Sequence, residues 1–286
     1  MKYCILIIIG LFQLSSALQS AASVAPPKPW IDLDRMDQET RLATLKNHVF
    51  ISPSHFPPLY QAAKDLQQLL ELAGIKAIGL FGCTLGIFRL GECLRWDDDV
   101  DYGVDIRDEN KIKALIPLAD KLGYNLFADD IVGYKFYRKE KLVDPETSES
   151  HNVFVDIFLY QLESDKYQLV REKGKALFPK AWLNKREFET RTVLKCGPLM
   201  MPCSTYTEDL LFRFYGLECK TQALFYFSHI KDVTVNYKWT IRLDTDEYLS
   251  FKDIQLEDRA TKVLLPSMSF DDWVSFNEKR EIPTIE

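Results

Sequence analysis

The sequence predicts an α+β domain in which helices flank a mixed β-sheet. The chain has 286 residues, of which 47% are apolar, so it is long enough to bury a large core. Apolar residues at helical spacing precede short apolar strands, and helical and strand-like segments then follow one another. No long linker interrupts them. We therefore expect a single folded domain over residues 56–220.

The charge balance excludes one class of partner. Lys and Arg total 36 against 42 Asp and Glu, which gives a net charge of −6. A protein that binds duplex nucleic acid by neutralising its phosphates needs the opposite sign. An acidic protein can still bind phosphates through metal ions, so we expect no nucleic-acid partner but keep phosphate chemistry open.

The N-terminus resembles a secretory signal peptide. Lys2 precedes an apolar run over residues 4–12, and small residues suited to cleavage follow. We predict a signal peptide at residues 1–22, an extended Pro-containing leader at 23–55, and a location in the endoplasmic reticulum or Golgi lumen or outside the cell. The alternative is a signal-anchored membrane form. Gln13 ends the apolar run well short of the about 20 residues that span a bilayer, so no stable span is expected after cleavage.

Five cysteines remain after the signal, in a compartment expected to be oxidising. They are Cys83, Cys93, Cys196, Cys203 and Cys219. Cys196 and Cys203 are close enough in sequence for a local disulfide, but spacing does not define connectivity. Buried free thiols are the alternative interpretation.

The main secondary-structure elements follow from periodicity and from capping residues. We predict a helix over residues 60–72, strands over 76–81 and 99–104, a helix over 108–122 kinked at Pro117, strands over 134–138 and 153–160, and a helix opened by a Thr205-x-x-Glu208 capping box and closed by Gly216. Residues 221–286 are interpreted as a C-terminal extension of the same domain.

An aspartate-rich strand carries the chemistry. Four aspartates lie within positions 97–101 and would repel one another unless a positive group sits among them. On a strand, Asp99 and Asp101 project from one face, whereas Val100 and Tyr102 face the core. Two carboxylates on one face suit Mg²⁺ or Mn²⁺, which also recruits substrate phosphates. A solvated acidic turn is the alternative.

Two further features strengthen the metal hypothesis. Gly82 and Gly86 follow a strand, where missing side chains would let backbone amides approach phosphate oxygens. Asp156 is the one charge in an apolar strand, and a buried carboxylate needs a cation. Together these features form the three-carboxylate pattern of a nucleotidyltransferase fold. Two metal ions between the three carboxylates would clamp an in-line phosphoryl transfer.

The same stretch resembles the LicD/fukutin-type phosphotransferase family, over about residues 60–220. The residues in register with the family's motifs are Gly82, Gly86, Arg89, Trp96, Asp97, Asp99 and Asp101, followed by Val155-Asp156-Ile157-Phe158, Pro202 and Tyr215-Gly216. The sequence departs from the family pattern at Cys83, Thr84, Arg95 and Leu217-Glu218. None of these departures removes a carboxylate.

The resemblance implies a nucleotidyltransferase-like, polymerase-β-type fold, a CDP-linked donor, a glycan or glycoprotein acceptor, and the transfer of ribitol phosphate or phosphocholine. We expect catalytic and metal-binding roles for Asp99, Asp101 and Asp156, and Asp156 is also expected to accept the proton of the attacking hydroxyl. The expected substrate-binding residues are Gly82, Thr84, Gly86, Arg89 and Asp97. The alternatives are that Arg89 pairs with the acidic cluster as structure and that Asp97 is a surface carboxylate, and Asp98 is expected to be solvated.

The leading hypothesis is therefore a metal-dependent phosphotransferase of the secretory pathway. A nucleotide-sugar glycosyltransferase would also use an Asp-x-Asp metal site, although the glycine pair and the lone Asp156 favour the first hypothesis. A secreted glycan-binding relative without turnover is the third, motivated by the departures at Cys83, Thr84 and Arg95.

Overall fold

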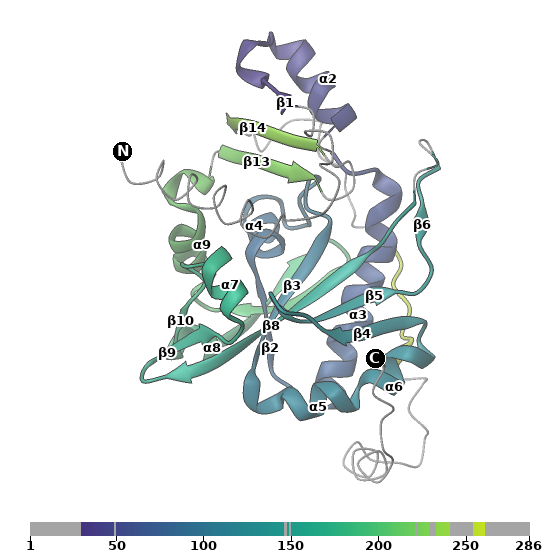
Figure 1. The fold of residues 1–286 in the computed structure, drawn as a ribbon, viewed down its shortest axis with the longest axis vertical. Helices are drawn as coiled ribbons and strands as arrows, with labels where there is room; N and C mark the ends of the chain where they lie inside the picture. The colour runs from purple at the N-terminus through teal and green to yellow at the C-terminus, as the bar shows by residue number, and fades with distance from the viewer. Residues whose placement is uncertain are drawn as a thin grey trace, which may run out of the picture.

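The computed structural model describes residues 30–48, 50–145, 148, 150–220, 222–228, 233–240 and 254–260. The predicted signal peptide at 1–22, the start of the leader and much of the C-terminal extension lie outside the described residues. The described part is an α+β domain with a mixed sheet flanked by helices, which confirms the predicted fold class (Figure 1).

A seven-stranded sheet forms the centre of the domain. Its strands are β2 (Ala77–Leu80), β3 (Asp99–Asp105), β4 (Tyr124–Ala128), β5 (Gly133–Arg138), β8 (Phe154–Glu163), β9 (Lys166–Leu169) and β10 (Leu183–Asn184). The order is β10-β9-β8-β3-β2, with β5 pairing both β4 and β8. β3 and β8 run parallel and the other pairs run antiparallel.

One face of this sheet packs on three helices, α3 (Phe56–Leu72), α5 (Glu109–Ala114) and α6 (Ile116–Lys121). Val100 and Tyr102 of β3 are buried in this core, as the alternation of side chains predicts. The sequence predicted one kinked helix over 108–122. Instead the chain breaks at Leu115, and Pro117 lies in the first turn of α6, where its missing N–H costs no hydrogen bond.

The other face packs on three helices, α7 (Glu172–Leu177), α8 (Lys185–Glu189) and α9 (Thr207–Tyr215) (Figure 1). Its core joins Leu80, Phe158 and Tyr160 of the sheet to Phe188 and Leu210 of the helices. The face that carries Asp101 and Asp156 is therefore buried around those carboxylates rather than open to water.

A hairpin of β11 (Arg191–Cys196) and β12 (Leu199–Ser204) packs on β2, and its strands are absent from the sequence-based prediction. In its register Cys196 faces Leu199 and Cys203 faces Thr192. The local Cys196–Cys203 disulfide is therefore wrong. All five described cysteines are free and buried, as the alternative interpretation held.

The start of α9 also differs from the prediction. Thr205 and Glu208 form no capping box. The hydroxyl of Ser204 accepts a hydrogen bond from the Tyr206 amide at 3.0 Å, and the hydroxyl of Thr207 donates to the Ser204 carbonyl at 2.6 Å. Gly216 ends the helix as predicted, with a φ of 86° that a side chain rarely adopts.

The remaining described elements border this domain. They are β1 (Trp30–Ile31), η1 (Leu33–Arg35), α2 (Gln38–His48), η2 (Pro53–His55), α4 (Phe81–Leu90), η3 (Ile106–Asp108), β6 (Leu142–Val143), β7 (Ser150–His151), η4 (Leu217–Lys220), β13 (Gln222–Ser228) and β14 (Val233–Thr240). Helix α2 differs from the extended leader predicted over 23–55. β1 pairs β14, so this part of the chain joins the C-terminal hairpin in a second sheet. Among the described helices, none has the length and apolar character needed to cross a bilayer.

We expect Tyr124→Phe to destabilise the domain by about 1–3 kcal/mol, because it removes a hydrogen bond to a buried carboxylate. The Tyr124 hydroxyl donates to Oδ2 of the fully buried Asp65 at 2.7 Å and so ties β4 to α3. Urea unfolding measures the change. Tyr137→Phe, on the neighbouring strand β5, is the matched control. Equal losses in the two variants would contradict this role of the Tyr124–Asp65 bond.

Candidate active site

Three carboxylates converge where β3 and β8 lie side by side. Asp101 on β3 is directly opposite Asp156 on β8, and Asp99 projects from the same face two residues earlier. One carboxylate oxygen from each of the three lies within 4.8 Å of the other two. Asp101 and Asp156 are only 7% and 5% exposed. The structure thus brings together the three residues that the sequence singled out for metal binding.

Negative charge predominates where these three carboxylates converge. Burial raises the pKa of Asp101 well above its usual range, and the charges of Asp99 and Asp156 raise it further. Like charges this close need a cation, and three carboxylate oxygens from rigid strands are the donors that Mg²⁺ and Mn²⁺ prefer. The residues therefore fit a divalent cation held by Asp99, Asp101 and Asp156.

Lys135 is a functional candidate that the sequence analysis misses. Its Nζ lies 2.8 and 3.0 Å from the two carboxylate oxygens of Asp156. Burial disfavours the charged ammonium, but the Asp156 carboxylate outweighs this effect and the pKa of Lys135 is raised. The strand over 134–138 is predictable, whereas the β5–β8 register that sets Lys135 opposite Asp156 is not.

Asp97 lies at the edge of the same cluster. Its Oδ2 is buried and has no hydrogen-bond partner among the described residues. Burial raises the pKa of Asp97 well above its usual range, and the charges of Asp99 and Asp98 add to the effect. A Cβ atom on Gly82 would overlap the Asp97 carboxylate, so the glycine is needed for this close approach.

Tyr215 also reaches this cluster. Burial of its hydroxyl raises the pKa of the phenol, and the carboxylates of Asp97 and Asp101 raise it further. The residue as a whole is 44% exposed, so part of its surface is open to solvent. Tyr215 belongs to the Tyr-Gly pair on which part of the family resemblance rests.

Asp98 and the predicted glycine turn need correction. Asp98 is 8% exposed rather than solvated, and its carbonyl oxygen is hydrogen-bonded to Nε2 of the buried His55 at 3.0 Å.

Gly82 and Gly86 lie inside helix α4 and not in a turn. A Cβ atom on Gly86 would overlap the Glu92 carbonyl oxygen, so this glycine allows the helix to pack against the following loop.

Thr84 and Arg89 lie on α4, and each donates a hydrogen bond to a backbone carbonyl. The Thr84 hydroxyl donates to the Phe81 carbonyl at 2.9 Å, and the residue is 4% exposed. Arg89 lies about 12 Å along the helix from Phe81. Its Nε donates to the Cys219 carbonyl at 2.6 Å. The substrate-binding roles of Thr84 and Arg89 stay predictions.

An aromatic cluster borders the site and is also absent from the sequence-based prediction. Phe81 follows Leu80, which pairs with Asp101, and its ring lies 4.9, 5.4 and 5.2 Å from the rings of Phe158, Phe178 and Phe214. Phe81 has a φ of 51°, a left-handed backbone that costs about 1–3 kcal/mol for a residue with a side chain. Such strain is typical of functional sites. Trp96, in contrast, stacks on Phe50, with the ring centroids 6.0 Å apart.

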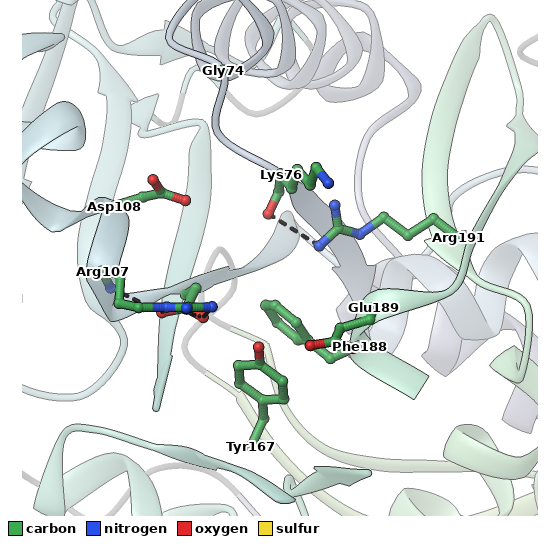
Figure 2. A pocket seen from close by; sticks show the side chains of 9 residues that line it. Gly74, Lys76, Arg107, Asp108, Tyr167, Phe188, Glu189 and Arg191 are labelled. Carbon is green, nitrogen blue, oxygen red and sulfur yellow. Dashed lines mark hydrogen bonds and ion pairs between the residues drawn. The ribbon is translucent and has the colours of Figure 1, made fainter. Parts of the chain in front are cut away.

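A separate cavity of about 560 Å³ lies at the far end of β3. Figure 2 shows Arg107 and Arg191 extending into it from opposite sides, with the Tyr167 hydroxyl directed between them. Arg107 forms a bidentate ion pair with Asp105, at 2.7 to 3.0 Å. Because Asp105 lies four residues beyond Asp101, about 13 Å along the strand, this cavity is distinct from the carboxylate cluster.

Comparisons with known proteins agree with this geometry. Residues 75–195 match the family model described as LicD/FKTN/FKRP, nucleotidyltransferase domain. This match to residues 75–195 confirms the resemblance found in the motifs. The match supports a transferase of a phosphotransferase-type family.

Two relatives are bacterial proteins described only as uncharacterized. RP689 of Rickettsia prowazekii is 35% identical over 68 residues, which are 24% of this chain and 26% of RP689. RT0683 of Rickettsia typhi is 30% identical over 109 residues, 38% of this chain and 30% of RT0683. The aligned region therefore covers less than a third of each relative.

We expect Asp101→Asn to raise the melting temperature of the metal-free protein by about 2–4 °C, because it removes one of three converging charges. The same variant should lose most of the stabilisation that 1 mM Mn²⁺ gives the wild type. Scanning calorimetry with EDTA and with Mn²⁺ measures both effects.

Asp105→Asn is the control, since Asp105 is equally buried on the same strand but is paired with Arg107. It should lower the melting temperature and keep the Mn²⁺ effect. Stabilisation of Asp101→Asn by Mn²⁺ to the wild-type extent would contradict the metal assignment.

Proposed function

We propose that this protein is a metal-dependent phosphotransferase that moves a phospho-alcohol, of the ribitol phosphate or phosphocholine type, from a CDP-linked donor to a glycan hydroxyl. The observation that carries the proposal is the convergence of Asp99, Asp101 and Asp156 on adjacent parallel strands. This cluster lies inside the segment that matches the LicD/FKTN/FKRP nucleotidyltransferase domain. A buried acidic cluster of this kind suits a diphosphate substrate bound with its divalent cation.

Each residue has a proposed role. Asp99, Asp101 and Asp156 hold Mg²⁺ or Mn²⁺, which when bound supplies Lewis-acid stabilisation of the charge on the phosphoryl oxygens. Asp156 also accepts the proton of the attacking glycan hydroxyl. Asp97 lies close enough to this cluster to contact the acceptor or the metal, which supports its place in the substrate-binding set.

The surroundings of the cluster suit a nucleotide-linked donor. Helix α4 starts at Phe81, next to Leu80, the residue that pairs with Asp101. The first backbone amides of this helix carry partial positive charge and therefore favour the binding of phosphate oxygens. The rings of Phe81 and Phe178 offer an aromatic surface beside these amides, and Phe178 is 38% exposed. We propose that the donor binds between this surface and the carboxylates.

We also propose that the protein acts in the secretory pathway or outside the cell. This part of the proposal rests on the signal-like residues 1–22 of the sequence. A glycan or glycoprotein acceptor is consistent with that location, because both are assembled there.

A direct assay tests the proposal. Purified protein is incubated with CDP-ribitol or CDP-choline, a panel of oligosaccharides and 1 mM Mn²⁺, and CMP release is measured. We expect release by the wild type, loss of release with EDTA, and at least about a hundredfold lower rate for Asp156→Asn. Asp130→Asn, which changes an exposed aspartate paired with Lys173, should retain the wild-type rate.

Other outcomes identify the alternatives. CMP release that Asp156→Asn leaves intact would contradict the site. Turnover of UDP-sugars in place of CDP-alcohols would favour a glycosyltransferase. Glycan binding without any turnover would favour a non-catalytic relative, and the departures at Cys83, Thr84 and Arg95 would then mark the loss of activity.

A further inference from the structure

Lys135 faces the carboxylate cluster from strand β5. Its Nζ lies within 3.0 Å of both oxygens of Asp156, and the two side chains are 27% and 7% exposed. The pairing of β5 with β8 places the two residues directly opposite each other. The ring of Phe154 lies 5.5 Å from the same Nζ. The sheet itself therefore fixes the ammonium beside the acidic cluster, unlike a surface lysine that swings freely.

The hydrogen-bonding capacity of Lys135 exceeds what Asp156 uses. An ammonium has three N–H donors, and Asp156 offers one oxygen to each of two of them. The third donor is available for an anion that enters the site, such as a substrate phosphate oxygen. Since Lys135 engages both oxygens of Asp156, that carboxylate is a poor bridge between two metal ions.

The charge balance leads to the same conclusion. Lys135 places one positive charge in direct contact with Asp156, and it therefore offsets part of the negative charge of the cluster, whose edge also includes Asp97. A second divalent cation would add two positive charges next to this ammonium. The ion pair at Asp156 thus favours a site for one ion.

We propose that Lys135 takes the place of a second metal ion, so that the site binds one divalent cation and presents the Lys135 ammonium to the substrate phosphate as its second positive group. This differs from the two ions that the sequence pattern suggests. The inference rests on the proposed function, because it assigns Lys135 a role toward the same phosphate substrate.

A purely structural role for Lys135 predicts the opposite change in metal affinity. If Lys135 only holds Asp156 in place, a neutral residue at position 135 leaves the Asp156 carboxylate less well positioned. Because Asp156 is a proposed metal ligand, metal binding then becomes weaker. If Lys135 replaces a metal ion, the neutral variant removes a repelling charge. Binding of the first ion then becomes tighter, or a second ion enters.

The test measures the number and affinity of bound Mn²⁺ ions by equilibrium dialysis and electron paramagnetic resonance, without turnover. The wild type should bind one Mn²⁺ per chain. Lys135→Met should bind a second ion, or the first at least about tenfold more tightly. Lys135→Arg keeps the charge and should bind one. Lys173→Met is the matched control, because Lys173 forms an equally short but exposed pair with Asp130 at 2.8 Å.

Two Mn²⁺ ions per wild-type chain would overturn the inference and leave the proposed function standing. Weaker or unchanged Mn²⁺ binding by Lys135→Met, with one ion bound, would overturn it as well. If Lys135→Met does not fold, the stoichiometries of the wild type and of Lys135→Arg decide. No binding by the wild type would contradict the proposed function, and this inference with it.

Discussion

The repulsion between Asp101 and Asp156 is the constraint on which the site depends. The two residues are paired across adjacent parallel strands, so neither can move away without breaking the sheet. Asp99 adds a third charge on the same face, and burial removes the water that would screen them. The protein therefore holds an energetically unfavourable arrangement that a cation relieves. Such an arrangement is what a binding site for metal-bound phosphates requires.

The rest of the domain makes this arrangement possible. A core that includes Val100 and Tyr102 fixes β3 from one side, and a second core with Leu80 and Phe158 fixes the sheet from the other. Stability from both cores offsets the cost of the converging charges. Lys135 adds a local counter-charge, so the carboxylates are close together but incompletely neutralised.

The sequence predicted those parts of the site that depend on residue type and strand alternation. Asp99 and Asp101 were identifiable because they alternate on an aspartate-rich strand, and Asp156 because it is the one charge in an apolar strand. Lys135 also lies on a predictable strand, but its role depends on which strands are neighbours and in which register, and one sequence does not contain that information. The fold class followed from periodicity, whereas the β11–β12 hairpin did not.

For Gly82 and Gly86 the error is of the opposite kind, because the sequence pattern was assigned to the wrong local structure. Gly82 and Gly86 resemble a phosphate-binding turn, yet both lie in a helix where they allow close packing on Asp97 and on the Glu92 carbonyl. A glycine indicates that another group lies close to the backbone, but the sequence does not say which group this is. The same limit applies to Arg89, whose partner is a backbone carbonyl 130 residues away.

The most direct test of the metal site is a crystal structure of the protein soaked in Mn²⁺, with anomalous diffraction recorded to locate the ion. We predict an anomalous peak about 2.0–2.4 Å from carboxylate oxygens of Asp99, Asp101 and Asp156 together. A crystal without any peak at these three residues, or with Mn²⁺ bound only elsewhere on the chain, would contradict the account.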